Sequence, residues 1–212
     1  MKVLVTGTSY GIGKAIALKF LENNSKVIGF DIKEDTIKHK NYKHFVQDIC
    51  EELPEINDLD IIINNAGIQE GNVIDVNLKG TINVTEKYIN PNIKSIIFIA
   101  SSSASTGSEF PEYVASKGGV LAYMKNVALR ISKFGATANS ISPGGVVTKL
   151  NEHIISYPNL YKQVLDETIL NKWATPEEIA DFTYFISVIN KSMTGEDIFI
   201  DNGEKLKSNF IW

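Results

Sequence analysis

Residues 3–31 read VLVTGTSYGIGKAIALKFLENNSKVIGFD, and their pattern of apolar residues and glycines indicates the fold class. Val3–Val5 is a short apolar run that leads into a glycine-rich turn, and Gly11–Leu21 carries apolar residues at helical spacing. Val27–Phe30 is a second apolar run, and Asp31 follows it directly. Two short apolar runs around one amphipathic segment predict a strand, a helix and a strand within about thirty residues.

The alternation of strands and helices continues along the chain. Apolar runs such as Ile61-Ile62-Ile63 and Ile96-Ile97-Phe98-Ile99 lack polar alternation, which is typical of strands covered on both faces. The pattern predicts an α/β fold, a single-domain Rossmann-type doubly wound parallel sheet with helices on both faces. Further strands are expected at 45–46, 59–63, 95–99, 137–141 and 197–200, and further helices at 73–88, 110–134 and 176–188.

The chain of 212 residues shows no internal repeat or linker, so we expect one nucleotide-binding domain with its catalytic site over residues 1–212. Residues 149–172 are the one stretch that does not fit the alternation, and they mix polar and aromatic side chains. Segments of this kind often close over a site. We therefore interpret 149–172 as a candidate substrate lid.

Composition and charge exclude several classes of function. The formal net charge is −4 and the 21 basic residues are scattered, so no basic face for nucleic acid is expected. The first residues run straight into Val3–Val5 and are too short for a signal peptide or a membrane span, which predicts a cytoplasmic protein. Cys50 is the single cysteine, and the three histidines show no metal-ligand spacing, so no metal is expected.

The turn between the first strand and the first helix reads Thr6-Gly7-Thr8-Ser9-Tyr10-Gly11-Ile12-Gly13. Glycines here let backbone N–H groups approach a pyrophosphate at the positive end of a helix. Asp31 ends the second strand, where a carboxylate accepts hydrogen bonds from the adenosine ribose and repels a 2′-phosphate. We therefore expect NAD as the cofactor over NADP, and Lys33 is the nearby cation that leaves NADP open.

Tyr113 and Lys117 are four residues apart in an expected helix, so their side chains share one face. A free tyrosine has a pKa of about 10 and is a poor proton carrier at neutral pH. A cation about 4 Å away, at an effective dielectric of about 20, favours the phenolate by on the order of 4 kcal/mol. This spacing, with Ser101 upstream, indicates a tyrosine that acts as an acid or base, although a Tyr–Lys pair alone is common on helices.

Taken together, these motifs resemble the short-chain dehydrogenase/reductase family of the single-domain type. The resemblance spans nearly the whole chain. It is carried by the glycine turn, Asn64-Asn65-Ala66-Gly67, Asn77, Ser101, Tyr113-x-x-x-Lys117, Pro143-Gly144-x-x-x-Thr148, Pro176-Glu177-Glu178-Ile179-Ala180 and Thr194-Gly195.

The resemblance implies the roles of the site residues. The catalytic set is Asn77, Ser101, Tyr113 and Lys117, in which Tyr113 passes the proton, Ser101 donates to the substrate oxygen, Lys117 holds the ribose and Asn77 supports a water. The cofactor set is Gly7, Ser9, Tyr10, Gly11, Ile12, Gly13, Asp31, Asp48, Ile49, Asn65, Ala66, Gly67, Tyr113, Lys117, Pro143, Gly144, Val146 and Thr148.

Departures from the family pattern fall on the substrate side. Ser101 lies one residue closer to Tyr113 than is commonest in the family, and Ser102 is the fallback for its role. The segments 32–63 and 68–76 are short, which predicts an open pocket that would suit a bulky or carrier-bound substrate such as a 3-oxoacyl thioester. Asp201-Asn202-Gly203 stands where Asp-Gly-Gly is usual.

The expected function is hydride transfer between NAD(H) and a secondary alcohol or ketone, with Tyr113 as general acid/base. The alternative is a catalytically silent NAD(H)-binding regulator, and a nucleotide-sugar enzyme of the extended branch is disfavoured by the lack of a larger C-terminal domain. The expected partners are a small-molecule substrate and a second copy of the chain, as a dimer or tetramer through helices 73–88 and 110–134. The sequence leaves the substrate, the direction and the stereochemistry open.

Overall fold

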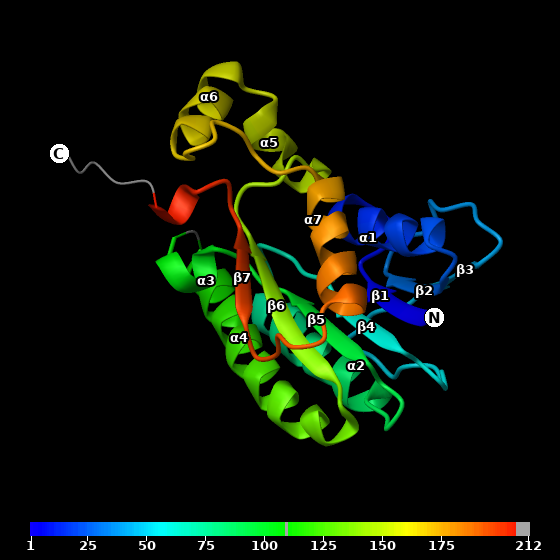
Figure 1. Cartoon of the computed structure of the whole chain (residues 1–212). Coiled ribbons are helices and arrows are strands. Elements are labelled where there is room, and N and C mark those ends of the chain that lie inside the picture. Colours follow the sequence, from blue (N-terminus) through cyan, green and yellow to red (C-terminus); the bar gives the residue numbers. More distant parts are fainter. Residues whose placement is uncertain (109, 207–212) are drawn as a thin grey trace.

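The computed structural model describes residues 1–108 and 110–206, and the predicted domain 1–212 extends beyond them at 109 and 207–212. Its centre is one seven-stranded sheet in which every neighbouring pair is parallel (Figure 1). The spatial order is β3-β2-β1-β4-β5-β6-β7. The strands are β1 Lys2–Thr6, β2 Lys26–Asp31, β3 Tyr42–Val46, β4 Ile61–Asn64, β5 Ser95–Ile99, β6 Thr137–Pro143 and β7 Asp197–Ile200. The predicted fold class is confirmed.

Helices cover both faces of the sheet (Figure 1). On one face lie α1 (Gly11–Glu22) and α7 (Pro176–Tyr184), and α7 continues into the short π-helix η4 (Phe185–Ile189). On the other face lie α4 (Pro111–Ile131) and α2 (Thr81–Tyr88), and α2 follows the short π-helix η1 (Ile74–Gly80). Shorter elements are α3 Ser103–Thr106, η2 Ser132–Phe134, η3 Lys149–Asn151, α5 Glu152–Ile155, α6 Pro158–Asp166 and η5 Glu204–Leu206.

The period of two along each strand sorts apolar side chains into two cores. In β4, Ile62 packs with the helices α2 and α4, whereas Ile61 and Ile63 pack with α1 and α7. All three side chains are almost fully buried. The unbroken apolar runs of the sequence thus belong to strands buried on both faces, as predicted.

The two connections beside β3 carry no helix. Within the described chain, residues 32–41 and 47–60 are irregular, although a doubly wound sheet usually places a helix in each crossover. Single apolar side chains cover the sheet instead, with Ile37 buried in the α1 core and Leu53 in the α4 core. The shortness of segment 32–63 noted in the sequence therefore reflects two missing helices.

The capping signals of the sequence fix where α7 begins. The Thr175 hydroxyl accepts a hydrogen bond from the Glu178 N–H (3.2 Å), and the Glu178 carboxylate accepts one from the Thr175 N–H (2.9 Å). This reciprocal pair is a capping box, with Pro176 at the first helical position. It anchors the point at which the chain returns from residues 149–172 to the sheet.

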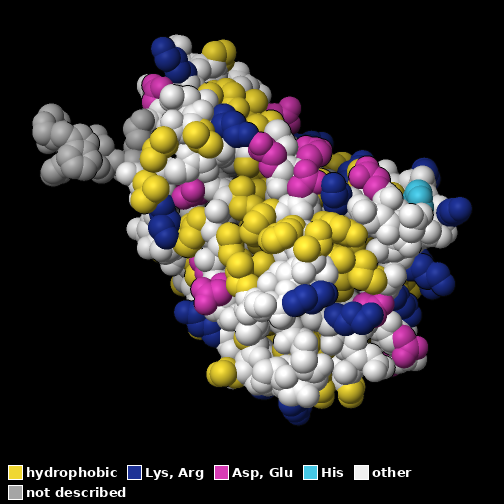
Figure 2. All heavy atoms as spheres, in the orientation of Figure 1, with side chains coloured by type: hydrophobic (Ala, Val, Ile, Leu, Met, Phe, Trp, Pro, Cys, Tyr) yellow, Lys and Arg dark blue, Asp and Glu magenta, His cyan; other side chains and the backbone are white. Residues whose placement is uncertain are grey.

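The outer surface of α7 and η4 is also apolar. Figure 2 shows hydrophobic side chains gathered over α7, and Phe185 and Ile189 are among the exposed ones. No helix in the described residues is long and apolar enough to cross a membrane.

Candidate active site

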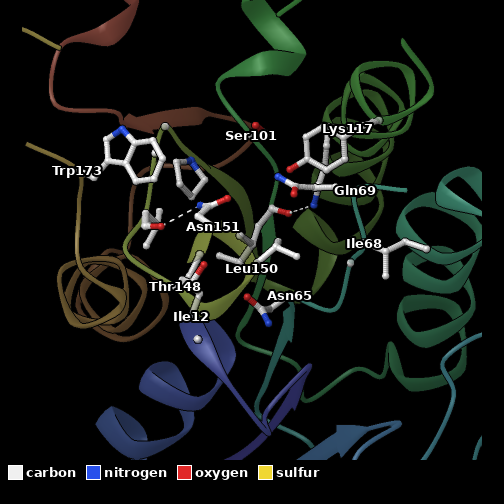
Figure 3. Close-up of a pocket in the computed structure, with 18 of the residues that line it drawn as sticks. Ile12, Asn65, Ile68, Gln69, Ser101, Lys117, Thr148, Leu150, Asn151 and Trp173 are labelled. Carbon is white, nitrogen blue, oxygen red and sulfur yellow. Dashed lines mark hydrogen bonds between the residues drawn. The ribbon is translucent and has the colours of Figure 1, made fainter. Parts of the chain in front are cut away.

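A cavity of about 630 Å³ lies at the carboxyl ends of the strands (Figure 3). It begins where β1 and β4 lie side by side although they are not consecutive in the chain. In such sheets ligands bind at this change in strand order. Of the predicted site residues, the cavity is lined by Gly7, Tyr10, Gly11, Ile12, Asp31, Asn65, Ala66, Gly67, Ser101, Tyr113, Lys117, Pro143, Gly144, Val146 and Thr148.

The glycine turn presents the N-terminus of α1 to the cavity. Gly11 has a φ of +55°, and a Cβ at Gly13 would lie 2.1 Å from the Gly7 carbonyl oxygen, so the turn requires glycines. Among the described residues no side chain caps α1, and its first turn holds no acidic residue. The free N–H groups and the helix dipole form a site for an anion such as a pyrophosphate.

Asn65 braces this turn from the end of β4. Its Nδ2 donates to the carbonyl oxygens of Thr6 (2.9 Å) and Gly7 (3.3 Å). In return, the Thr6 hydroxyl accepts hydrogen bonds from the N–H groups of Asn65 and Ala66, both at 3.0 Å. These contacts tie the ends of the two strands together beneath the cavity.

Asp31 lies at the end of β2 and lines the cavity. Its carboxylate accepts hydrogen bonds from the N–H groups of Ser9 and Lys33, both at 2.9 Å. The carboxylate is thereby oriented by two backbone groups. It holds a negative charge beside the glycine turn, where the ribose of a dinucleotide binds in this class of fold.

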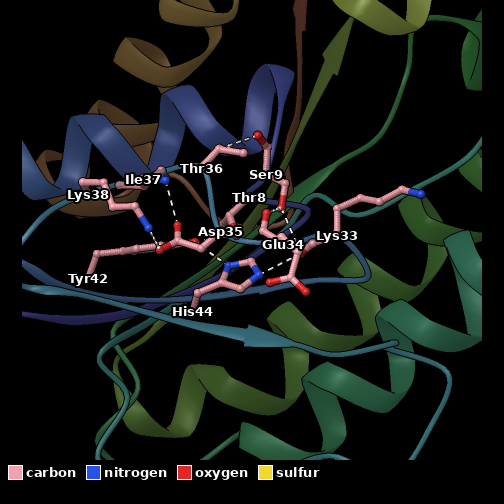
Figure 4. A network of polar contacts seen from close by, with 10 residues as sticks. All are labelled: Thr8, Ser9, Lys33, Glu34, Asp35, Thr36, Ile37, Lys38, Tyr42 and His44. Carbon is pink, nitrogen blue, oxygen red and sulfur yellow. Dashed lines mark hydrogen bonds and ion pairs between the residues drawn. The ribbon is translucent and has the colours of Figure 1, made fainter.

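A polar network holds the segment after β2, where the described chain forms no helix (Figure 4). The Tyr42 hydroxyl donates to Thr8 Oγ1 (2.8 Å) and contacts His44 Nδ1 (3.0 Å), and His44 Nε2 contacts the Lys33 carbonyl oxygen (2.8 Å). Burial raises the pKa of Tyr42 to about 12, so this phenol is neutral. A Cβ at Gly29 would lie 2.1 Å from the Tyr42 oxygen, so only glycine leaves room for the network.

Tyr113 and Lys117 lie on α4 and reach the cavity from the side opposite the glycine turn. Lys117 is only 6% exposed, and its ammonium donates to the Ile99 carbonyl oxygen at 2.9 Å. The same ammonium lies 5.8 Å from the centroid of the Tyr113 ring. The four-residue spacing thus brings the pair together, as predicted, at the end of β5.

Ser101 follows β5 and lines the same cavity, whereas Ser102 does not. The Ser101 hydroxyl oxygen accepts hydrogen bonds from the hydroxyl (2.9 Å) and the N–H (3.2 Å) of Ser103. Within the described chain it donates to no group, so its own proton is available to a substrate oxygen. This geometry favours Ser101 over the fallback residue.

Asn77 lies in the π-helix η1 and is 1% exposed. Its amide binds the backbone of Ile68 and donates to the Ser116 hydroxyl at 3.1 Å. Gly67 packs closely beside it, since a Cβ there would lie 3.1 Å from Asn77 Oδ1 and 3.5 Å from the Lys117 ammonium. Asn77 is therefore near Lys117, but its side chain is behind the cavity wall and not on it.

Four predicted cofactor residues also lie outside the described cavity lining: Ser9, Gly13, Asp48 and Ile49. The Ser9 hydroxyl points to the neighbouring loop and donates to the Glu34 carbonyl oxygen at 2.9 Å. Asp48 is exposed and accepts from the Cys50 N–H at 2.8 Å, and Ile49 is 5% exposed in the α4 core. The adenine contact expected at 48–49 stays a prediction.

The far end of the cavity contains residues that sequence reasoning did not assign. Gln69 follows the Asn-Asn-Ala-Gly motif by two positions, which was the available signal for it. Several others lie in the lid segment 149–172 or next to it, where composition marked a region and not individual residues. The unassigned lining includes Ile68, Gln69, Phe110, Leu150, Asn151, His153, Ile154, Val164, Glu167, Trp173 and Glu204.

The residues present fit a nicotinamide dinucleotide. The uncapped helix end accepts a pyrophosphate, Asp31 accepts ribose hydroxyls, and Lys117 can reach a second ribose beside Tyr113. No group of three or more histidine, cysteine or acidic side chains within 1–108 and 110–206 could hold a metal ion.

Comparison with known proteins supports an oxidoreductase site. Residues 38–205 match a family model described as enoyl-(acyl carrier protein) reductase. The chain is 31% identical to a 3-oxoacyl-(acyl-carrier-protein) reductase of Buchnera aphidicola subsp. Acyrthosiphon pisum, over 94% of this chain and 95% of that protein.

Two solved structures are similar along the whole chain. A short chain dehydrogenase family protein of Francisella tularensis superposes with a TM-score of 0.86 at 29% identity, covering 97% of this chain and 99% of that one. A 4-hydroxyisoleucine dehydrogenase complexed with NADH and succinate superposes with a TM-score of 0.87 at 28% identity, covering 99% and 100%.

Proposed function

Because the chain belongs to the short-chain dehydrogenase/reductase family of oxidoreductases, we propose that it transfers a hydride between NAD(H) and a secondary alcohol or ketone. Tyr113 is the general acid/base in this proposal. The observation that carries it is that Ser101, Tyr113 and Lys117 line one cavity together with the uncapped end of α1. Proton transfer and cofactor binding can therefore occur in the same space.

Each side chain has a distinct role in the reaction. Ser101 donates a hydrogen bond to the substrate oxygen, where charge develops in the transition state. Tyr113 exchanges a proton with that oxygen, and the Lys117 ammonium favours the phenolate form of Tyr113. The bound nicotinamide supplies the hydride chemistry. Asn77 acts as a positioning residue, since its amide is fully used by Ile68 and Ser116.

Asp31 supports NAD over NADP as the cofactor. The side chain is held by two backbone N–H groups, so it cannot turn away from a 2′-phosphate without losing both hydrogen bonds. Lys33 donates its backbone N–H to this carboxylate. A like charge next to an adenosine 2′-phosphate disfavours NADP.

Residues 149–172 form the lid in this proposal, attached to a single domain that carries both cofactor and catalytic residues. The elements η3, α5 and α6 project from the body of the molecule at the end where the cavity opens (Figure 1). The chain segments that enter and leave the lid are joined at its base: the Ala174 N–H donates to the Gly145 carbonyl oxygen (3.0 Å), and the Val147 N–H donates to the Ala174 carbonyl oxygen (2.9 Å). Movement of the lid about this base would open or cover the substrate end of the cavity.

The same family membership favours association of two or more copies through α2 and α4. Leu129, in the last turn of α4, is 78% exposed, so its apolar side chain could pack against a second copy of the chain. Sedimentation that gives a monomer at micromolar concentration would contradict this part of the proposal.

A turnover assay separates the proposal from a catalytically silent regulator, which the relatives named above do not favour. NADH oxidation with a panel of ketones, and NAD reduction with the matching alcohols, should give activity in the parent protein. Tyr113→Phe should lower kcat by about 10²-fold to 10⁴-fold, the usual contribution of a general acid/base, with NADH binding preserved. Tight NADH binding with no turnover of any substrate class would favour the regulator.

A further inference from the structure

The substrate end of the cavity lies beyond the Ser101, Tyr113 and Lys117 side chains, and uncharged or acidic hydrogen-bonding groups stand there among apolar side chains. Gln69 and Asn151 provide amides, and Glu167 and Glu204 provide carboxylates. Trp173 forms one wall, and a Cβ at Gly145 would lie 2.2 Å from its ring, so the indole is packed directly on the backbone. In Figure 3, Gln69 lies on the side of Lys117, and Asn151 lies on the side of Trp173.

The two lysines of the described lining are located elsewhere, and His153, which also lines the cavity, contacts the Leu150 carbonyl oxygen through its Nδ1 at 3.2 Å. Lys117 is buried against the Ile99 carbonyl oxygen and the Tyr113 ring. Lys149 lies over the ring of Tyr10, 5.5 Å from its centroid, at the nucleotide end. Glu167 adds a negative charge to the lining at the substrate end, which repels a phosphate or a carboxylate.

The amides are placed to bind hydroxyl groups. The Gln69 side chain makes no hydrogen bond within the described chain, so both its donor and its acceptor are available to a ligand. Asn151 is held by its nitrogen, which donates to the Val146 carbonyl oxygen at 2.9 Å. Amide and carboxylate groups both accept hydrogen bonds from hydroxyls, and a purely apolar substrate would leave these groups unpaired.

We propose that the substrate is a neutral polyhydroxylated molecule, an aldose or a polyol. Its reacting carbinol lies at Ser101 and Tyr113, and its other hydroxyls bind Gln69, Asn151, Glu167 and Glu204. This inference rests on the proposed function. In the oxidation, the carbinol C–H bond breaks and the hydride passes with its electron pair to NAD⁺. The hydroxyl proton passes to Tyr113, and the product is a ketone, or a lactone when the carbinol is an anomeric carbon.

The test compares kcat/KM for four groups of compounds with NAD⁺ or NADH. The neutral group contains D-glucose, D-galactose, D-mannose, D-xylose and sorbitol. The other groups are D-glucose 6-phosphate, which adds only a charged phosphate; cyclohexanol and 2-aminocyclohexanol, which lack further hydroxyls; and an acetoacetyl thioester with NADH. We expect at least one neutral polyol to exceed every compound of the other groups by about 100-fold or more, since sites built to bind hydroxyls reject analogues without them.

The outcomes separate an error in the substrate class from an error in the proposed function. Turnover that is confined to cyclohexanol, the amino alcohol, the phosphate or the thioester would overturn the substrate class and leave the hydride transfer standing. Turnover of no compound in either direction, with NADH bound, would overturn the proposed function itself.

Variants test the named residues. Gln69→Leu should raise KM for the preferred polyol about tenfold with KM for NAD⁺ unchanged, as expected for one lost hydrogen bond to a buried hydroxyl. Glu167→Gln should narrow the discrimination against D-glucose 6-phosphate. Glu152→Gln is the matched control, because Glu152 is exposed on the same lid and does not line the cavity.

A binding measurement removes any dependence on turnover. Calorimetric titration of the polyol into the Tyr113→Phe variant loaded with NAD⁺ should show binding that Gln69→Leu weakens about tenfold. Equal affinities with and without the Gln69 amide would overturn its assignment.

Discussion

The side-chain amide of Asn77 forms two hydrogen bonds with the backbone of Ile68, accepting from its N–H at 2.8 Å and donating to its carbonyl oxygen at 2.9 Å. The amide thus pairs with Ile68 as a neighbouring strand would. It fixes the segment that leaves β4 and carries Gly67 on one side of Ile68 and Gln69 on the other.

Asn77→Ala removes three hydrogen bonds of a side chain that is 1% exposed. We expect the free energy of unfolding to fall by about 2–4 kcal/mol, because buried polar groups of Ile68 and Ser116 lose their partner. We also expect kcat/KM to fall, since the Gln69 wall loses its support. Denaturant unfolding and steady-state kinetics measure both effects. Asn83→Ala is the control, because Asn83 is on α2 and its amide donates to carbonyl oxygens of the 49–51 segment, away from the cavity.

Strands β1, β4 and β5 were predictable because each contains a continuous apolar run, whereas β3 and β6 include polar residues and were predicted from the alternation of strands and helices. All seven predicted strands are present, with shifts of up to three residues at their ends: β4 begins at Ile61 instead of Leu59, and β3 begins at Tyr42 instead of Phe45. The two π-helices were not predictable, since residues 74–80 and 185–189 have the same apolar spacing as the α-helices that they join. Over such short segments, an apolar repeat of about 3.6 residues does not distinguish the i→i+5 hydrogen bonds of a π-helix from the i→i+4 hydrogen bonds of an α-helix.

In the proposed function, Asp31 sets the preference for NAD over NADP. NADH should bind the parent protein at least about tenfold more tightly than NADPH, a difference of about 1.4 kcal/mol. Asp31→Ala should narrow this gap, because it removes the charge that repels the 2′-phosphate. Fluorescence titration of both cofactors gives the ratio, and equal affinities in the parent protein would refute the role.

Asp31→Asn helps to separate charge from structure. The asparagine oxygen can still accept one of the two N–H groups that Asp31 holds, those of Ser9 and Lys33. The gap between the cofactors should narrow in this variant too, while the glycine turn is disturbed less than in Asp31→Ala.

Two adjacent glycines of α4 should respond in opposite ways to alanine. Nothing lies within 4 Å of a Cβ at Gly118, so Gly118→Ala should stabilise the protein by about 1 kcal/mol through helix propensity. A Cβ at Gly119 would lie 2.7 Å from Leu78 Cδ2, so Gly119→Ala must displace a packed side chain, at a cost of about 1–3 kcal/mol. Denaturant unfolding should rank Gly118→Ala above the parent and Gly119→Ala below Gly118→Ala. The reverse order would contradict this packing of η1 against α4.

The residues proposed to be catalytic were easier to predict than those at the far end of the cavity, for a physical reason. Ser101, Tyr113 and Lys117 are placed by a strand end and a helix repeat, both of which are local in sequence. Trp173 and Glu204, in contrast, reach the cavity from segments whose position depends on contacts across the fold, such as the Leu170 N–H that donates to the Asn202 carbonyl oxygen at 3.2 Å. Local spacing contains no information about such contacts.

Asp60 should make stability depend on acid, away from the cavity. Its carboxylate accepts from the Lys2 N–H at 2.7 Å and pairs with the Lys94 ammonium at 2.6 Å, which links the starts of β1, β4 and β5. Burial raises the pKa of Asp60, but the hydrogen bonds from Lys94 and from the Lys2 backbone outweigh it and hold the pKa below the ordinary value of 3.8. A carboxyl whose pKa is lowered by folding stabilises the folded state above its unfolded-state pKa.

Asp60→Asn should therefore lower the free energy of unfolding by about 1–2 kcal/mol at pH 7, the usual worth of a hydrogen bond to a charged group in a partly exposed site. The difference from the parent should shrink as the pH falls below 3.8 through the folded-state pKa of Asp60, because the parent carboxylate is then protonated and loses the same interactions. Urea unfolding at a series of pH values measures this difference. Asp58→Asn is the control, since Asp58 is exposed and at its φ of +60° asparagine is well tolerated. A destabilisation by Asp60→Asn that is the same at pH 7 and below the folded-state pKa would show that the charge of Asp60 contributes nothing.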